Sequence, residues 1–220
     1  MHGRVPPSGD ARGTTLGYGP LVRDRALRWV VAMSLVVSLI GYGQFEVGMP
    51  VFARQVSEVS TFTLGLAFGV NTAVIVLLQF AVMRWLTGRR RTRALAATAV
   101  LWAVAWMMFG LTGLVAGGAT AAAGVVVSLG VFGVGEALMQ PTSASLVNDL
   151  APGHMRGRYN AAFSSASQAG AVVAPLASGV ILGRHWSTAF VAVLLALCVV
   201  FAAIALRLEG LVSPAVNGRR

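Results

Sequence analysis

The protein has 220 residues, of which 56% are hydrophobic and 11% are charged, and its mean hydropathy is +0.76. Soluble domains of this size carry about twice that share of charged residues, so the composition excludes an ordinary soluble domain and indicates a membrane protein. The formal net charge of +10 comes from 17 arginines and seven acidic residues. In a soluble protein such basicity would suggest nucleic-acid binding, so the positions of the arginines decide its meaning.

The N-terminal segment, residues 1–28, contains prolines, glycines and arginines but no apolar core. It therefore lacks the pattern of a cleavable signal peptide, and the first apolar segment must itself direct membrane insertion. We expect residues 1–28 to be a disordered, linker-like tail on the cytoplasmic side.

Six long apolar segments follow this tail. A helix needs about 20 apolar residues to cross about 30 Å of hydrocarbon, and transmembrane barrels show much shorter, alternating segments. The fold class is therefore predicted to be an all-α polytopic membrane protein, a six-helix bundle over residues 29–206 followed by a cytoplasmic tail at 207–220. The predicted spans are 29–52, 61–83, 94–114, 121–146, 159–182 and 187–206.

The arginines sort onto alternate sides of these spans. Fifteen of the 17 fall on one side, and only Arg54 and Arg184 fall on the other. Because arginine and lysine accumulate in short cytoplasmic loops, this pattern predicts that both termini are cytoplasmic. The absence of lysine suggests a GC-rich bacterial genome, and hence the bacterial inner (plasma) membrane. The basicity is thus a signal of orientation, and we expect no nucleic acid among the partners.

Three stretches carry a family resemblance: GYGQFEVGMP at 41–50, GRRR at 88–91 and APGHMRGRYNAA at 151–162. With six spans in this order, the chain resembles the C-terminal half of a major facilitator superfamily transporter and is most similar to bacterial drug:proton antiporters. The resemblance covers about residues 20–207. It implies a 3+3 inverted repeat within the six helices and a function in transmembrane transport.

The loop after the second span departs from the family pattern. In that family a loop of this kind carries a Gly-x3-Asp-Arg-x-Gly-Arg-Arg motif whose acidic residue controls conformational switching. The corresponding positions here are Ala81, Trp85, Gly88, Arg89 and Arg90, and the acidic residue is absent. We therefore expect this loop to have a topological role and no role in gating.

The length is the larger departure, because a complete transporter of this family has about 12 helices in two halves. Residues 16–27 resemble the end of the linker that joins the halves. Two interpretations remain open. The chain is a truncated or split transporter that needs a second six-helix half, or it is a half-size protein that works with a copy of itself.

Two acidic residues fall within predicted spans, Glu46 in the first and Glu136 in the fourth. A charge near the centre of a bilayer costs several kcal/mol, so each side chain should face the bundle interior or a wet cavity. Because removal from water favours the neutral acid, such a group can carry a proton. The family resemblance implies that these two spans line the central cavity. The alternative role for each glutamate is a neutral acid that is hydrogen-bonded between helices.

Further polar residues accompany the two glutamates. Tyr42 precedes Glu46 by one helical turn and Gln140 follows Glu136 by one turn, so each pair shares a helix face. Asn71 and Gln168 lie in the second and fifth spans, where they either line the pathway or bond between helices, whereas Gln79 is interpreted as a packing residue. An apolar lining is expected from Phe45, Met49, Phe132 and Met139. A stripe of small residues in the fifth span predicts close helix packing: Ser167, Gly170, Ala171, Ala174 and Ser178.

The leading hypothesis is secondary, proton-coupled efflux of a small amphipathic molecule, with the lipid bilayer as the protein's surroundings. The alternative is a structural fragment that does not transport by itself. We do not expect an enzyme, since the sequence lacks His-Glu-x2-His, Gly-x-Ser-x-Gly and Walker-type motifs. We also expect no cofactor and no metal, because Cys198 is the only cysteine and the histidines have no partner ligands nearby.

Overall fold

A computed structural model describes residues 23–218, and within them six helical segments are long and apolar enough to cross a membrane. The number and order of the predicted spans are confirmed. The first span is α2 (Arg25–Ile40), a π-helical segment η1 (Gln44–Gly48) and α3 (Met49–Gln55). The others are α4 (Thr61–Leu86), α5 (Arg91–Leu111) with the 3-10 turn η2 (Thr112–Val115), α6 (Ala119–Leu150), η3 (Gly153–Met155) with α7 (Arg156–Gly183), and α8 (Ser187–Glu209).

The ends of the chain differ from the prediction in detail. Helix α2 begins at Arg25 rather than at residue 29, with Asp24 as its N-cap, and the rest of the predicted N-terminal tail lies outside the described residues. At the other end α8 continues to Glu209. Residues 210–218, within the predicted tail, then form turns that pack against the bundle.

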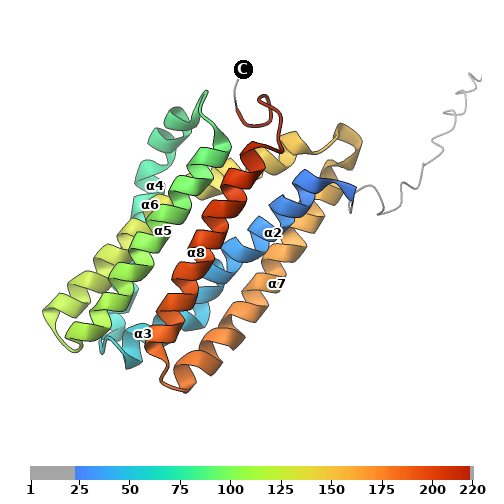
Figure 1. Cartoon of the computed structure of the whole chain (residues 1–220). Coiled ribbons are helices and arrows are strands. Elements are labelled where there is room, and N and C mark those ends of the chain that lie inside the picture. The colour runs from blue at the N-terminus through green and yellow to red at the C-terminus, as the bar shows by residue number, and fades with distance from the viewer. Residues whose placement is uncertain (1–22, 219–220) are drawn as a thin grey trace, which may run out of the picture.

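The helices pack in a pattern that fits an inverted repeat (Figure 1). Helix α2 packs mainly on α7 and α8, α6 packs mainly on α4 and α5, and α5 lies against α8. The first span of each three-helix unit therefore contacts the second and third spans of the other unit. Exchanging the two units leaves this pattern unchanged, as expected for half of the major facilitator fold.

Two tryptophans of α5 join the two units. The Nε1 of Trp102 donates a hydrogen bond to the carbonyl oxygen of Phe132 in α6 (3.1 Å), and the indole stacks on the Phe132 ring with 4.5 Å between ring centroids. The Nε1 of Trp106 donates to the carbonyl oxygen of Ile40 at the end of α2 (3.0 Å). Because both indoles are buried and satisfied, they hold α5 against α6 and α2.

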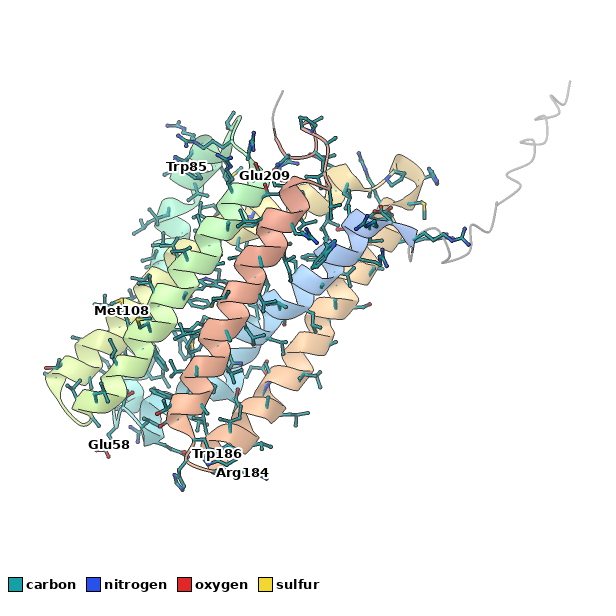
Figure 2. All side chains as sticks on the ribbon, in the orientation of Figure 1. Glu58, Trp85, Met108, Arg184, Trp186 and Glu209 are labelled. Carbon is teal, nitrogen blue, oxygen red and sulfur yellow. The ribbon has the colours of Figure 1, made fainter. Side chains whose placement is uncertain are left out.

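The described arginines lie at the two ends of the bundle. All except Arg54 and Arg184 lie at the end where α2 begins and α8 finishes, which we call the basic end. Figure 2 shows Trp85 and Glu209 at this end and Arg184 and Trp186 at the opposite one. The middle of the bundle is therefore free of arginine among the residues that the structure describes.

Helices α2 and α7 approach each other through small residues. A Cβ added at Gly43 would lie 2.3 Å from the Cβ of Ala174, and one added at Gly170 would lie 2.7 Å from the Cβ of Ser38. Gly170, Ala174 and Ser178 are buried, which confirms the predicted packing stripe of the fifth span.

The first prediction concerns this contact. Gly43→Ala should lower the stability of the folded bundle by about 1–3 kcal/mol, because the added methyl group has no space against Ala174. Gly65→Ala is the matched control, since a Cβ at Gly65 meets nothing within 4 Å. Thermal unfolding in detergent checks both variants, and equal melting temperatures for the two would contradict the close approach.

Candidate functional site

The first span changes its helical pitch next to the predicted glutamate. Between Gln44 and Gly48 the backbone is π-helical, and the N–H of Met49 donates to the carbonyl oxygen of Gln44. Glycine has a low helix propensity and proline lacks an N–H, so the sequence from Gly41 to Pro50 does not favour a regular α-helix. Short π-helical turns inside helices are frequent at functional sites.

Gln44 stabilises this irregular turn. Its side chain is buried, its Nε2 donates to the carbonyl oxygen of Leu39 (2.6 Å), and its Oε1 accepts a hydrogen bond from the hydroxyl of Ser178 in α7 (2.7 Å). The sequence analysis did not single out Gln44. The glycines around Gln44 indicate an irregular helix, but they do not indicate which polar side chain turns into the bundle.

Four of the six predicted site residues come together around Glu136. The Glu136 side chain is 6% exposed, and the Nε2 of Gln140 donates to its Oε1 at 3.3 Å. Tyr42 and Asn71 lie beside the same carboxyl group, and Asn71 also donates to the carbonyl oxygen of Leu129 (3.2 Å). The Oε2 of Glu136 is buried and has no hydrogen-bond partner of good geometry. Among the described residues, the hydroxyl oxygen of Ser38 is the other buried side-chain atom without such a partner.

Glu46 and Gln168 have no described hydrogen bond to this cluster. Both side chains are exposed, whereas Glu136 is buried. The two glutamates thus have different surroundings. Their positions in the sequence, each within a predicted span, do not reveal this difference.

Five large polar side chains are exposed in the central parts of the spans. We call them the polar face, and they are Tyr42, Glu46, Gln79, Gln140 and Gln168. They come from the first span, α4, α6 and α7, whereas the described central parts of α5 and α8 expose apolar side chains such as Val104, Met107, Val193 and Val199. Hydrocarbon cannot hydrogen-bond to the polar face, so water or another protein segment must cover it.

A cavity of about 370 Å³ lies next to Gln140, between α4 and α6. Gln79 and Pro141 also line it. Gln79 is exposed there, so it does not pack between the described helices. The expected apolar lining also needs correction, because Met49, Phe132 and Met139 are buried in the core and only Phe45 is partly exposed.

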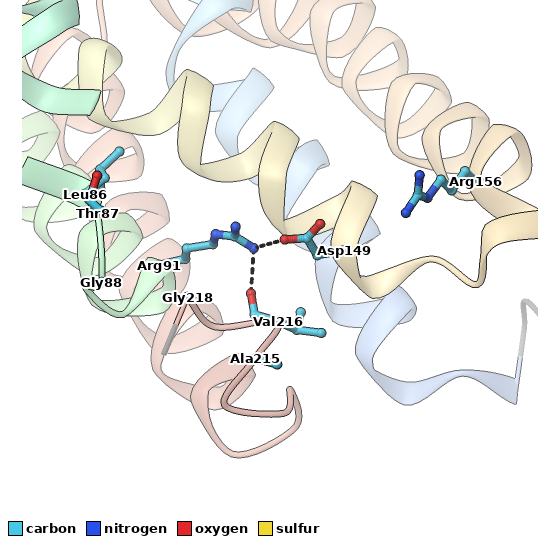
Figure 3. Close-up of a pocket in the computed structure, with 9 residues that line it drawn as sticks. All are labelled: Leu86, Thr87, Gly88, Arg91, Asp149, Arg156, Ala215, Val216 and Gly218. Atoms are coloured by element: carbon cyan, nitrogen blue, oxygen red, sulfur yellow. Dashed lines mark hydrogen bonds and ion pairs between the residues drawn. The ribbon is translucent and has the colours of Figure 1, made fainter. Parts of the chain in front are cut away.

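A second, larger cavity of about 1080 Å³ lies at the basic end (Figure 3). There Arg91, which follows the GRR part of the loop motif, donates to Oδ2 of Asp149 at 2.6 Å and to the carbonyl oxygen of Val216 at 2.7 Å. Arg90 forms an ion pair with Glu209. The loop therefore contacts the ends of other helices. It has this structural role in addition to the topological role expected from the sequence. Asp149, at the end of α6, supplies an acidic partner although the loop itself has none.

His154, His185 and Cys198 do not form a metal site with acidic neighbours. No group of three His, Cys, Asp or Glu side chains within residues 23–218 is arranged to hold a metal ion.

Comparison with known families agrees with this architecture. The family model described as Major Facilitator Superfamily matches residues 82–220, more than half of the chain. The chain belongs to the Major Facilitator Superfamily. Its six apolar helices are consistent with half of the fold of that superfamily.

A curated relative supports the same family. An uncharacterised MFS-type transporter of Escherichia coli strain K12, YdeE, is 29% identical over 164 residues. The match covers 74% of this chain and 40% of the relative, so the chain spans less than half the length of the transporter it resembles. The family model and this relative agree on the Major Facilitator Superfamily.

The second prediction tests the role of Gln44. Gln44→Ala should destabilise the bundle by about 1–3 kcal/mol, because the Leu39 carbonyl and the Ser178 hydroxyl lose a buried partner. Gln168→Ala, on an exposed position of α7, should change the stability by less than about 0.5 kcal/mol. Unfolding in detergent measures both values, and a Gln44 variant as stable as the Gln168 variant would exclude this role.

Proposed function

We propose that the chain is the C-terminal half of a secondary transporter that exports a small amphipathic molecule in exchange for protons. The observation that carries the proposal is the Glu136 carboxyl group, buried in the middle of α6 with Oε2 unpartnered. Membership in the Major Facilitator Superfamily supports transport in general, and the surroundings of Glu136 support the coupling to protons.

Glu136 has the surroundings of a group that exchanges a proton. The ion pairs described between side chains lie at the basic end and involve Arg90, Arg91 and Arg93, and none of these described pairs includes Glu136. A buried carboxyl group without a cation beside it is stabilised as the neutral acid. Entry of water or of a positively charged group would stabilise the carboxylate and release the proton.

Tyr42 offers a route between Glu136 and the surroundings. Its side chain lies beside the Glu136 carboxyl group and is 40% exposed on the polar face. A hydroxyl group both donates and accepts hydrogen bonds, so Tyr42 can connect the buried acid to water or to a bound substrate. Gln140 donates to Glu136 and lines the 370 Å³ cavity, so it can connect the acid to water or substrate on that side.

The surroundings of the site favour an amphipathic substrate that carries a positive charge. Phe45 of the first span lies between Phe68 and Phe132, with ring centroids 5.4 Å and 5.5 Å away. Aromatic faces attract cations and pack against apolar rings. Glu46, exposed next to Phe45, adds a negative charge that no described ion pair neutralises.

The polar face supports a second six-helix half as the partner. Helices α4 and α7 bury only 17% and 22% of their most apolar windows, the smallest shares among the six spans. Polar groups exposed on the first span, α4, α6 and α7 would lose their hydrogen bonds to water in lipid. A second half that leaves a wet cavity above Glu136 would cover the apolar parts and keep the polar residues hydrated.

The orientation follows from the basic end. We propose that this end faces the cytoplasm, because the arginines gather there and only Arg54 and Arg184 lie at the other. Both termini would then be cytoplasmic in the bacterial inner membrane.

The third prediction tests the coupling. In inverted membrane vesicles that contain the chain and its complementary half, Glu136→Gln should reduce proton-driven ethidium transport to the level of vesicles without the protein. The amide keeps the size of the side chain but cannot exchange a proton. Glu58→Gln, in an exposed loop, is the control and should transport normally. Full transport by both Glu136→Gln and Glu46→Gln would exclude coupling through these acids.

The fourth prediction addresses the alternative, a fragment or half-size protein. Light scattering in detergent should give the mass of a single 22.8 kDa chain when it is purified alone, and a larger complex of higher melting temperature when the complementary half is present. A stable dimer of this chain that transports ethidium by itself would instead identify a half-size transporter that works with its own copy.

A further inference from the structure

Helix α5 begins at the basic end without a cap of its own. Arg90 occupies the N-cap position, and its side chain makes no capping hydrogen bond but pairs with Glu209 of α8. The first N–H groups of a helix have no partners within the helix, so α5 needs an acceptor from elsewhere.

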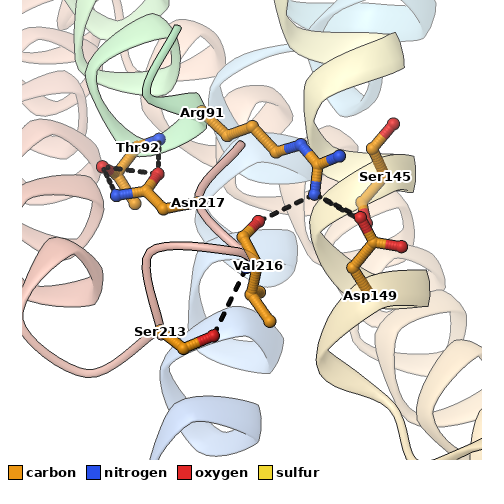
Figure 4. A network of polar contacts seen from close by, with 7 residues as sticks. All are labelled: Arg91, Thr92, Ser145, Asp149, Ser213, Val216 and Asn217. Carbon is orange, nitrogen blue, oxygen red and sulfur yellow. Dashed lines mark hydrogen bonds and ion pairs between the residues drawn. The ribbon is translucent and has the colours of Figure 1, made fainter. Parts of the chain in front are cut away.

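The C-terminal segment supplies that acceptor (Figure 4). The side-chain Oδ1 of Asn217 accepts hydrogen bonds from the backbone N–H of Thr92 (3.0 Å) and from its hydroxyl (3.1 Å). The backbone N–H of Arg91 donates to the carbonyl oxygen of Asn217 (3.0 Å). Asn217 is 4% exposed and Thr92 is fully buried. Asparagine is among the preferred N-cap residues, and here it caps a helix that begins 125 residues earlier in the chain.

The same segment also holds Arg91. The carbonyl oxygen of Val216 accepts from the Arg91 guanidinium at 2.7 Å, and Asp149 at the end of α6 accepts from the same nitrogen at 2.6 Å. The segment keeps its shape through Ser213, whose carbonyl oxygen accepts from the N–H of Asn217 (2.9 Å). One turn of chain thus contacts α5 directly and reaches α6 through Arg91.

The segment is covalently continuous with α8. Glu209, in the last turn of α8, pairs with Arg90 and with Arg93 (3.4 Å), so α8 and α5 are also joined by charge. Ala215, Val216 and Gly218 line the 1080 Å³ cavity together with Thr87 and Asp149. Movement of the segment would therefore change access to this cavity.

We propose that residues 211–218 form a latch, in which Asn217 caps α5 and thereby holds the basic-end termini of α5, α6 and α8 together. When the latch is docked these three ends move as one body. When Asn217 leaves Thr92, α5 loses its cap, Arg91 loses the Val216 carbonyl, and the cavity opens. The latch does not depend on proton exchange at Glu136, so the two proposals can fail independently.

The experiment compares the full chain with Asn217→Ala in lipid nanodiscs. Hydrogen exchange should become about fivefold faster at the first turn of α5, residues 92–95, because its cap is lost. Exchange in the middle of α6 serves as an internal reference, and an equal rise in both places would mean general destabilisation and overturn the proposal. Asn217→Asp keeps the Oδ1 acceptor and should exchange like the native chain.

A matched control uses another asparagine at the same end. The Oδ1 of Asn148 accepts from Asn160 on the exposed surface, and Asn148→Ala should leave exchange in α5 unchanged. An unchanged rate in Asn217→Ala would show that Asn217 is not the cap.

The second measurement tests movement, which a purely structural cap would not affect. In a Cys198→Ala background, Leu86→Cys places a thiol at the end of α4, in the wall of the 1080 Å³ cavity. A water-soluble maleimide should label this thiol several-fold faster when Asn217→Ala is added, and at the native rate with Asn217→Asp. Faster exchange in α5 without faster labelling would overturn the latch.

Discussion

The structure depends on the fact that hydrocarbon offers no hydrogen-bond partners, so polar groups inside the spans must find partners within the protein. Several side chains meet this need by donating to backbone carbonyl groups. Trp102 and Trp106 donate to carbonyls of α6 and α2, Gln44 donates within the first span, and Asn71 of α4 donates to α6. These bonds link helices that an apolar surrounding would not drive together, because lipid tails are as apolar as the side chains.

The candidate site lies where a buried polar group lacks a full set of hydrogen-bond partners. Glu136 has one oxygen bonded to Gln140 and one oxygen without a partner, and the polar face beside it is exposed. An arrangement of this kind is unstable in a bilayer unless water or substrate enters it. In the proposed transporter, these same residues would move a proton and a ligand between the two halves. The latch lies at the basic end, where arginine–carboxylate ion pairs connect the ends of the helices.

The predictions from the sequence were best for elements that depend on local pattern. Six spans, their order and the packing stripe of the fifth span were correct, because length, hydrophobicity and small-residue spacing are properties of a single segment. The site was predicted in part. Glu136, Gln140, Tyr42 and Asn71 do gather, whereas Glu46, Gln168 and Gln79 are exposed and have no described hydrogen bond to that cluster. A helical repeat of about 3.6 residues cannot place side chains across the π-helical turn at 44–48.

The sequence by itself determined the membrane class, the number of spans and the sorting of the arginines, since each follows from the cost of placing polar groups in hydrocarbon. Only the tertiary structure decided which polar groups satisfy one another. Gln44 meets Ser178 across 134 residues, and Asn217 caps the helix at Thr92 across 125 residues. Such pairs depend on which helices become neighbours and how closely glycines let them approach, and no local pattern in the chain records that choice.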